Sequence, residues 1–105
     1  MVFSAVGSSV NVELSSSYIS PDGDGFEDVV DIIIEGPEAE YYTARIYDRQ
    51  GRLVKWLCVK ERYLPPPMNW DGLSDAGKRL PIGMYIIYVE AAGVGAVKKP
   101  IVVAR

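Results

Sequence analysis

Three aspartates lie in one glycine-rich run, with a spacing that suits the binding of a cation. They stand in residues 20–28, SPDGDGFED. Calcium takes about six to eight oxygen ligands, and alternate aspartates around a glycine turn can supply several of them together with a backbone carbonyl. The spacing therefore predicts a calcium site, whose expected ligands are the side chains of Asp22, Asp24 and Asp28 and the carbonyl of Phe26.

The same run is also typical of a tight turn without a metal. In that interpretation the aspartates accept hydrogen bonds from nearby backbone N–H groups, and the glycines take left-handed conformations. A complete EF-hand is excluded, because Ser20 and Asp31 stand where that loop needs an aspartate and a glutamate, and the flanks resemble strands. If calcium binds, its expected role is to stiffen the loop.

A second polar loop, residues 70–85, contains Asp71 and Asp75. These two could form another cation site or an acid/base pair. Asp-Gly and Asp-Ala-Gly sequences are far more typical of turns, however, and the turn is the interpretation that we favour. Trp70 at the start of this loop and Trp56 in an apolar segment are both expected to lie in the core.

The composition excludes most catalytic classes. The 105 residues include no histidine and one cysteine, which rules out Ser-His-Asp triads, Cys-His dyads, histidine-containing metal sites and an intrachain disulfide. With 11 Lys+Arg against 14 Asp+Glu the net charge is −3 and no basic stripe is present, so nucleic acid is not an expected partner. No apolar run is long enough for membrane insertion, and the first residues lack the basic region of a signal peptide. We therefore expect a module that is not an enzyme.

Frequent chain breakers limit the elements that can position these residues. With 10 Gly and 7 Pro, the chain has little room for long helices. The segments between them are short and rich in Val, Ile, Tyr and Thr, which predicts strands. The expected fold is all-β, an antiparallel immunoglobulin-like β-sandwich of about seven strands. The clearest strands are residues 10–14, 29–35, 41–48, 53–59, 84–91 and 96–104.

Two turns and one proline predict how some of these strands are connected and placed. Residues 48–51, DRQG, predict a hairpin turn with a bulge in which Gly51 takes a positive φ, and residues 93–95, GVG, predict a second hairpin. Pro100 cannot donate to a sheet ladder, so the last strand is expected at an edge of its sheet.

Alternation along residues 41–48 separates a core face from an outer face. Tyr42, Ala44 and Ile46 are expected in the core, and Tyr41 and Tyr47 on the outside. Exposed tyrosines on a sandwich can stack on sugars. A carbohydrate-binding module with Tyr41 and Tyr47 at its site is therefore one alternative function.

Four short motifs in a fixed order resemble a known family. They are residues 20–28, residues 44–54 (ARIYDRQGRLV), residues 70–77 (WDGLSDAG) and residues 83–85 (GMY). Their order resembles the immunoglobulin-like domain of the bacterial flagellar hook-capping protein and the C-terminal domains of surface and secreted proteins, including type IX secretion sorting tails. The resemblance implies a non-catalytic structural or interaction module of an extracellular or cell-surface protein. Its implied partners are proteins: the parent chain, the secretion machinery or neighbouring copies.

The apolar beginning of the chain suggests a third function. We expect residues 1–9 to be an arm or leader and residues 10–105 to be the sandwich. Val2 and Phe3 could then add as a strand to an exposed edge of a neighbouring copy, as in a self-assembling subunit of a filament, shell or appendage. The competing interpretation is that residues 2–14 form the first strand of their own domain.

Overall fold

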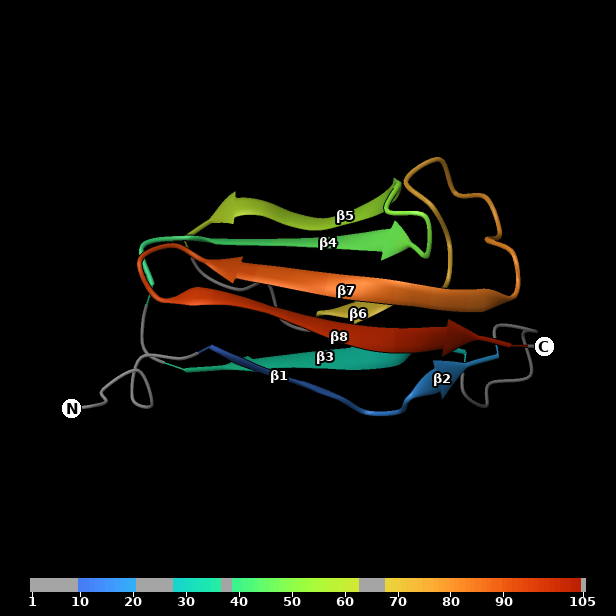
Figure 1. The fold of residues 1–105 in the computed structure, drawn as a ribbon, viewed down its shortest axis with the longest axis horizontal. Helices are drawn as coiled ribbons and strands as arrows, with labels where there is room; N and C mark the ends of the chain where they lie inside the picture. The colour runs from blue at the N-terminus through green and yellow to red at the C-terminus, as the bar shows by residue number, and fades with distance from the viewer. Residues whose placement is uncertain (1–9, 21–27, 37–38, 63–67, 105) are drawn as a thin grey trace.

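A computed structural model describes residues 10–20, 28–36, 39–62 and 68–104. Every regular element in these ranges is a strand, and none of them contains a helix that could span a lipid bilayer. The strands labelled in Figure 1 are β1 (Asn11–Leu14), β2 (Tyr18–Ile19), β3 (Val30–Glu35), β4 (Tyr42–Asp48), β5 (Leu53–Glu61), β6 (Asn69–Trp70), β7 (Gly83–Ala91) and β8 (Gly95–Val103).

The strands form two sheets that pack into a sandwich. The smaller sheet has the order β1-β3-β6, and the larger sheet has the order β2-β8-β7-β4-β5 (Figure 1). All neighbours are antiparallel except β2 and β8, which are parallel. The predicted all-β sandwich is confirmed. The described residues contain more strands than expected because β2 and β6, with two residues each, are too short to show a period.

The chain changes sheets between β1 and β2. At the end of β1, the Ser15 N–H donates to the Asp31 carbonyl at 3.0 Å, and the Ser15 hydroxyl accepts the Asp31 N–H at 2.9 Å. Two residues later the Ser17 carbonyl accepts the Val102 N–H of β8 at 3.1 Å. One continuous segment therefore closes an edge of both sheets.

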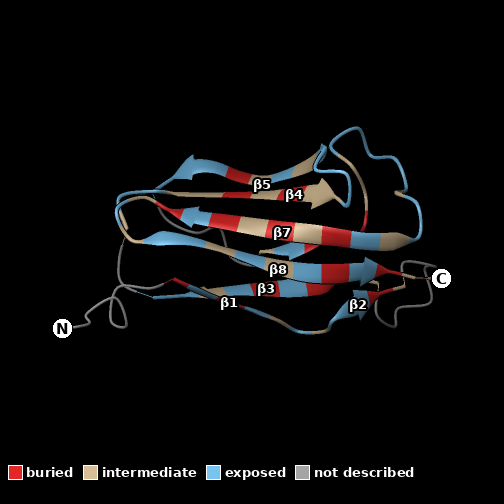
Figure 2. Cartoon of the chain, viewed as in Figure 1, coloured by how far each residue is buried: buried red, intermediate tan, exposed pale blue. Residues whose placement is uncertain are grey.

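Side chains alternate between core and solvent along the strands, which Figure 2 shows as alternating bands on β7. Ala44 and Ile46 are fully buried and Tyr42 packs against the core, as predicted. Each fully buried Val or Ile side chain stabilises the fold by about 1.5–3 kcal/mol. The buried hydrophobic residues are Val10, Val12, Ile19, Val30, Ile32, Ala44, Ile46, Cys58, Trp70, Tyr85, Ile87, Val89, Ala91, Ile101 and Val103.

The two tryptophans occupy opposite environments. Trp70 is 1% exposed, its ring stands edge-on to Tyr85 at 5.8 Å, and its Nε1–H donates to the Leu73 carbonyl, so its predicted core position is confirmed. The core position expected for Trp56 is wrong, because Trp56 is 38% exposed. A register shift between β4 and β5 pairs Trp56 with Arg45 and Cys58 with Ala44. Cross-strand partners share a face, so Trp56 follows Arg45 outward while Cys58 follows Ala44 inward.

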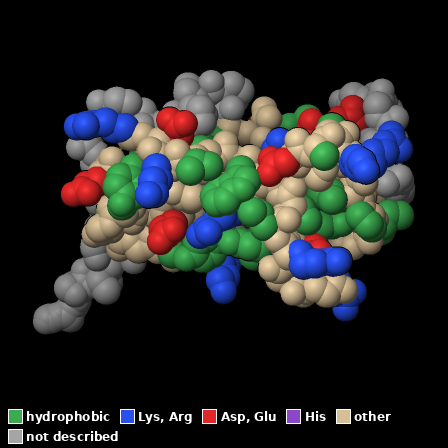
Figure 3. All heavy atoms as spheres, turned by 90° about the horizontal axis from the view of Figure 1, so that it is seen from above, with side chains coloured by type: hydrophobic (Ala, Val, Ile, Leu, Met, Phe, Trp, Pro, Cys, Tyr) green, Lys and Arg blue, Asp and Glu red, His purple; other side chains and the backbone are tan. Residues whose placement is uncertain are grey.

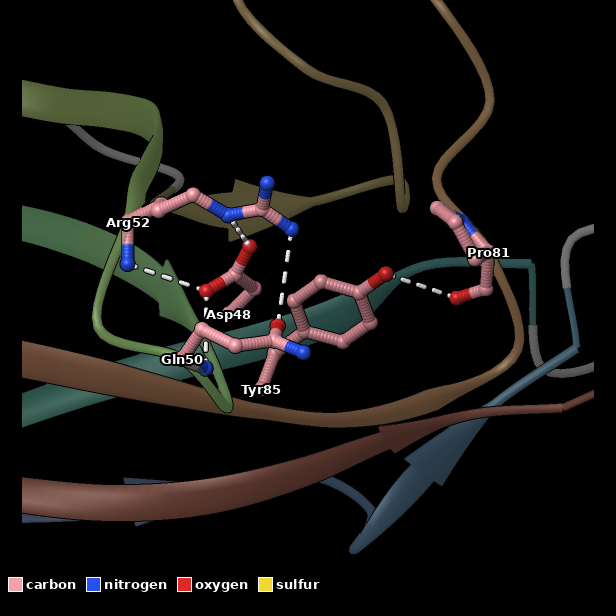
Figure 4. Close-up of polar contacts among 5 residues, drawn as sticks. All are labelled: Asp48, Gln50, Arg52, Pro81 and Tyr85. Atoms are coloured by element: carbon pink, nitrogen blue, oxygen red, sulfur yellow. Dashed lines mark hydrogen bonds and ion pairs between the residues drawn. The ribbon is translucent and has the colours of Figure 1, made fainter.

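The β4–β5 turn is held by a single carboxylate (Figure 4). Oδ1 of Asp48 accepts the backbone N–H groups of Gln50 and Arg52 at 2.9 Å, and Oδ2 accepts Nε–H of Arg52 at 2.8 Å. Gly51 takes a φ of +86°, and its N–H donates to the Asp48 carbonyl. Because Tyr47 pairs with Leu53 and Ile46 pairs with Lys55, the predicted bulged hairpin is confirmed.

The last strand lies inside its sheet, which corrects the expected edge position. β8 pairs along its whole length with β7, and its final residues also pair with β2. The N–H groups of Val102 and Ala104 donate to Ser17 and Ile19, toward β2. Pro100, two residues before Val102, has its nitrogen on that same side and costs no bond to β7. The predicted hairpin at residues 93–95 is confirmed, since the Val94 N–H donates to the Ala91 carbonyl and Gly93 has a φ of +82°.

Candidate functional site

The outer face of the larger sheet gathers five side chains from four strands. In the strand register Arg45 of β4 lies opposite Trp56 of β5 and Tyr88 of β7, and Tyr88 lies opposite Lys98 of β8. Tyr47 stands two residues from Arg45 on the same face. We call Arg45, Tyr47, Trp56, Tyr88 and Lys98 the basic aromatic face.

Arg45 lies at the centre of this face. Its guanidinium carbon is 5.1 Å from the ring centre of Tyr88, 5.5 Å from that of Trp56 and 5.8 Å from that of Tyr47. Lys98 Nζ lies 5.9 Å from the Tyr88 ring. These distances suit cation–π attraction, which holds the arginine without using its N–H donors.

Few polar partners engage the Arg45 guanidinium. Nη2 donates to Oε1 of Glu90 at 3.5 Å, at the outer limit for a hydrogen bond, and Nε is buried with no partner in the described structure. The Glu90 side chain is half exposed. An arginine placed in this way can receive a planar anionic group such as a carboxylate.

A shallow groove runs beside Arg45 on this face. Three of its lining side chains are cationic, and its single carboxylate, Asp48, is occupied by the β4–β5 turn. The complete lining is Arg45, Tyr47, Asp48, Arg49, Gly51, Ile86, Tyr88 and Lys98. Seen from the β5 side, hydrophobic side chains lie with Lys and Arg, and also with Asp and Glu, among them (Figure 3). The groove is suited to binding an anionic partner with an apolar component.

The local hydrogen bonds shift the pKa of Asp48. The Arg52 backbone N–H holds the pKa of this carboxyl below its ordinary value, and the Arg52 side chain and the Gln50 N–H act in the same direction. Its carboxylate therefore stays charged, and its oxygens are already hydrogen-bonded within the turn.

Two other titratable groups are held neutral. Burial raises the pKa of Tyr85, whose hydroxyl donates to the Pro81 carbonyl at 2.7 Å (Figure 4), and the charge of Asp48 adds to this effect. Burial also raises the pKa of Cys58, whose thiol donates to the Tyr42 carbonyl. A buried thiol with a raised pKa is a packing group and a poor nucleophile.

The predicted calcium ligands fall mostly outside the described residues. Asp22, Asp24 and Phe26 are not described, and Asp28 is a half-buried residue shortly before β3. Within the described ranges no three His, Cys, Asp or Glu side chains gather as metal ligands would. Calcium binding in residues 20–28 stays a prediction.

The two tyrosines proposed for glycan binding are separated by most of β4. Tyr41 lies just before the strand and its carbonyl accepts the Ala92 N–H, whereas Tyr47 belongs to the basic aromatic face. The Tyr47 and Tyr88 rings meet at 77°, which does not form one flat stacking surface. Glycan binding stays a prediction, as does the arm interaction of Val2 and Phe3, which lie outside the described residues.

The acidic residues of the second loop shape the loop and cover a strand edge. The Asp71 carboxylate accepts the Leu73 N–H at 3.1 Å. The Asp75 N–H donates to the Val54 carbonyl, and its carboxylate accepts the Trp56 N–H at 3.1 Å. Asp75 therefore takes the place of a neighbouring strand along this part of β5 and protects its edge.

Sequence reasoning missed most of the basic aromatic face. Of its five residues, the sequence predicts a binding role for Tyr47 alone. Alternation in residues 41–48 already places Arg45 beside Tyr47 on the outer side. The contribution of the other strands depends on cross-strand register, which the sequence does not display.

Comparisons with known proteins place this architecture in a family. Residues 12–102 match the model of the CHU_C type IX secretion signal domain. A structure of PorZ from Porphyromonas gingivalis, described as an essential surface component of the type IX secretion system, superposes with a TM-score of 0.61 at 20% identity over 90% of this chain. The structure of dimeric latent PorU from the same organism superposes with a TM-score of 0.58 at 23% identity over 90% of this chain.

These neighbours are much larger proteins. The chain spans 12% of PorZ and 9% of PorU, so the structural likeness concerns the fold. No curated protein sequence matches the chain at a significant level. The family match covers nearly every described strand, including the basic aromatic face. This chain belongs to the type IX secretion signal domain family, a family of non-catalytic secretion and surface modules.

Proposed function

We propose that this domain directs an attached protein to the type IX secretion system through recognition by a protein of that machinery. The single observation that carries the proposal is the family match over residues 12–102, which spans the sandwich from β1 to β8. The proposed site of action is the cell surface or the outside of the cell.

The geometry supports recognition of a folded surface. The two sheets enclose a continuous apolar core, and both described hairpins of the larger sheet are closed by hydrogen-bonded turns. Rigid strands hold exposed side chains at fixed spacing, which reduces the entropy lost on binding. A folded module of this kind can be read by a receptor while the attached protein varies.

An export experiment tests the proposal. The chain is fused to the C-terminus of a periplasm-directed reporter in a bacterium that has a type IX secretion system, and the reporter is measured in the cells and in the medium. We expect release or surface display only with the fusion, and retention in a strain whose system is inactivated. A reporter fused to an unrelated immunoglobulin-like domain is the matched control. Export that persists without the system, or that the control domain also supports, would overturn the proposal.

A further inference from the structure

We propose that the basic aromatic face is a binding site for an acidic segment of a partner protein, with the Arg45 guanidinium receiving a carboxylate of that segment. This deepens the proposed function and rests on it only in taking the partner to be a protein of the secretion machinery. The binding itself is a property of the folded domain and can be measured alone.

Arg45 is preorganised for binding. Three aromatic rings between 5.1 and 5.8 Å away hold its guanidinium in place, and a ring face accepts no conventional hydrogen bond from it at these distances. The planar fork of an arginine matches a carboxylate in two parallel hydrogen bonds. The fold therefore restrains the Arg45 side chain before the partner arrives, which reduces the conformational entropy lost on binding.

Glu90 provides the carboxylate that already pairs with Arg45. Glu90 contacts Arg45 at 3.5 Å with a half-exposed side chain, so this ion pair is long and screened by solvent. It occupies the position that we assign to the partner's carboxylate. A better-placed carboxylate from a partner would displace Glu90 at little cost, because Glu90 can return to water.

Positively charged side chains gather in the groove. The whole chain carries −3, yet Arg45, Arg49 and Lys98 line one groove. The acid in the groove, Asp48, already accepts three hydrogen bonds from the turn. The groove therefore presents an excess of positive charge that is complementary to an acidic segment.

The surroundings of Tyr88 favour a peptide over a sugar as the ligand. Sugars stack on an open ring face, but Arg45 and Lys98 both lie over the Tyr88 ring, and Tyr47 meets that ring edge-on. Ile86 and Tyr47 supply apolar lining beside the cations. This mixture suits a peptide in which acidic and apolar residues alternate.

Titration of the purified domain with a synthetic peptide tests the assignment. The probe is a short peptide of alternating glutamate and leucine, and the controls replace its glutamates by glutamine or lysine. The ring centre of Trp56 lies 5.5 Å from the guanidinium carbon of Arg45, and Trp56 is partly exposed, whereas Trp70 is buried. A change in tryptophan fluorescence on binding therefore reports on this face. We expect saturable binding of the glutamate peptide that weakens with added salt, and much weaker binding of both controls.

Substitutions locate the binding. Arg45→Lys is expected to weaken binding by about tenfold because the planar fork is lost, and Lys98→Gln by about threefold. Lys78→Gln removes the same charge from the exposed second loop and should leave the affinity unchanged. Glu90→Gln should tighten binding by a few-fold because the competing carboxylate is gone. Glu13→Gln on the smaller sheet is the matched control and should leave the affinity unchanged.

Several results would overturn the proposal. They are equal affinity for the glutamine peptide, no binding to a folded domain, an equal loss with Lys78→Gln, or weaker binding after Glu90→Gln. Tighter binding of an acidic polysaccharide such as polygalacturonate would overturn the peptide assignment. If Arg45→Lys fails to fold, Lys98→Gln and Glu90→Gln still decide the outcome. The titration uses the purified domain without a secretion system. A failure of binding is therefore distinguishable from a failure of export.

Discussion

The two outer faces of the sandwich differ in chemistry although they enclose one core. On the larger sheet, Arg45 and Lys98 lie among aromatic rings. On the smaller sheet, the exposed residues are mainly acidic or amide, with one exposed isoleucine; they are Asn11, Glu13, Asp31, Ile33, Glu35 and Asn69. The net charge of −3 for the whole chain therefore does not reveal that positive side chains gather on one outer face.

This difference follows from what the core requires of each strand. The inward positions of both sheets are occupied by similar aliphatic and aromatic residues, as one close-packed core requires. The outward positions are free of that requirement, and there the two sheets diverge. Residues that build the core and residues that face solvent are neighbours in sequence on alternate sides of the same strands.

The largest expected effect comes from breaking the core that both faces share. Trp70→Ala should lower the free energy of unfolding by about 3–5 kcal/mol, since Trp70 is almost fully buried against Tyr85. Trp56→Ala removes the same side chain from the outer face and should cost about 1 kcal/mol or less. Urea unfolding followed by circular dichroism measures both. Similar losses for the two tryptophans would contradict the inward and outward assignment.

A smaller effect is expected at the edge of β5 that supports the basic aromatic face. Asp75→Asn should reduce stability by about 1 kcal/mol, because the charged acceptor of the Trp56 N–H is lost. Hydrogen exchange at the Trp56 amide should accelerate. Asp71→Asn, at a turn of the same loop, is the control and should leave that amide unchanged. Unchanged exchange in Asp75→Asn would show that the loop does not protect this edge.

The β4–β5 turn gives a prediction about pH. Folding lowers the pKa of Asp48 from its ordinary value of 3.8. The Asp48 carboxylate therefore stabilises the fold at pH values above that ordinary pKa, and this contribution is lost as the pH falls through the lowered pKa. Asp48→Asn should be less stable than the parent near neutral pH, and the difference should shrink at strongly acidic pH. Thermal unfolding at several pH values tests this. A constant difference across the acidic range would contradict it.

The smallest effect is expected at Pro100. Its nitrogen lies on the side away from β7, so Pro100→Ala should change stability by no more than about 0.5 kcal/mol. The adjacent Ile101 is fully buried, and Ile101→Ala should be clearly destabilising. Both are compared by thermal unfolding. A large loss with Pro100→Ala would mean that β8 depends on the proline for its position.

Much of the fold is predictable from local patterns. Alternation in residues 41–48 assigns Ala44 and Ile46 to the core, and the glycine at position 51 marks the hairpin turn. Strands β2 and β6 escape notice because two residues show no period. Pro100 suggests an edge only until the direction of its nitrogen is known.

The candidate site is harder to predict because it depends on register. Arg45, Trp56 and Tyr88 are far apart in sequence and meet only through the pairing of three strands. In β5 the bulges turn Trp56 outward, although the surrounding apolar run favours a core position. In β7 both faces are apolar over much of the strand, which leaves the outward position of Tyr88 without a clear signal.

Paired variants of the two outer faces, each fused to the export reporter, measure what each face contributes to export. One fusion carries Arg45→Glu and Lys98→Glu on the larger sheet, and the other carries Glu13→Lys and Glu35→Lys on the smaller sheet, with folding of both domains verified by circular dichroism. We predict that the larger-sheet variant stays in the cell while the smaller-sheet variant is exported like the parent domain. Equal export of both variants, or loss only in the smaller-sheet variant, would show that export does not depend on the basic aromatic face.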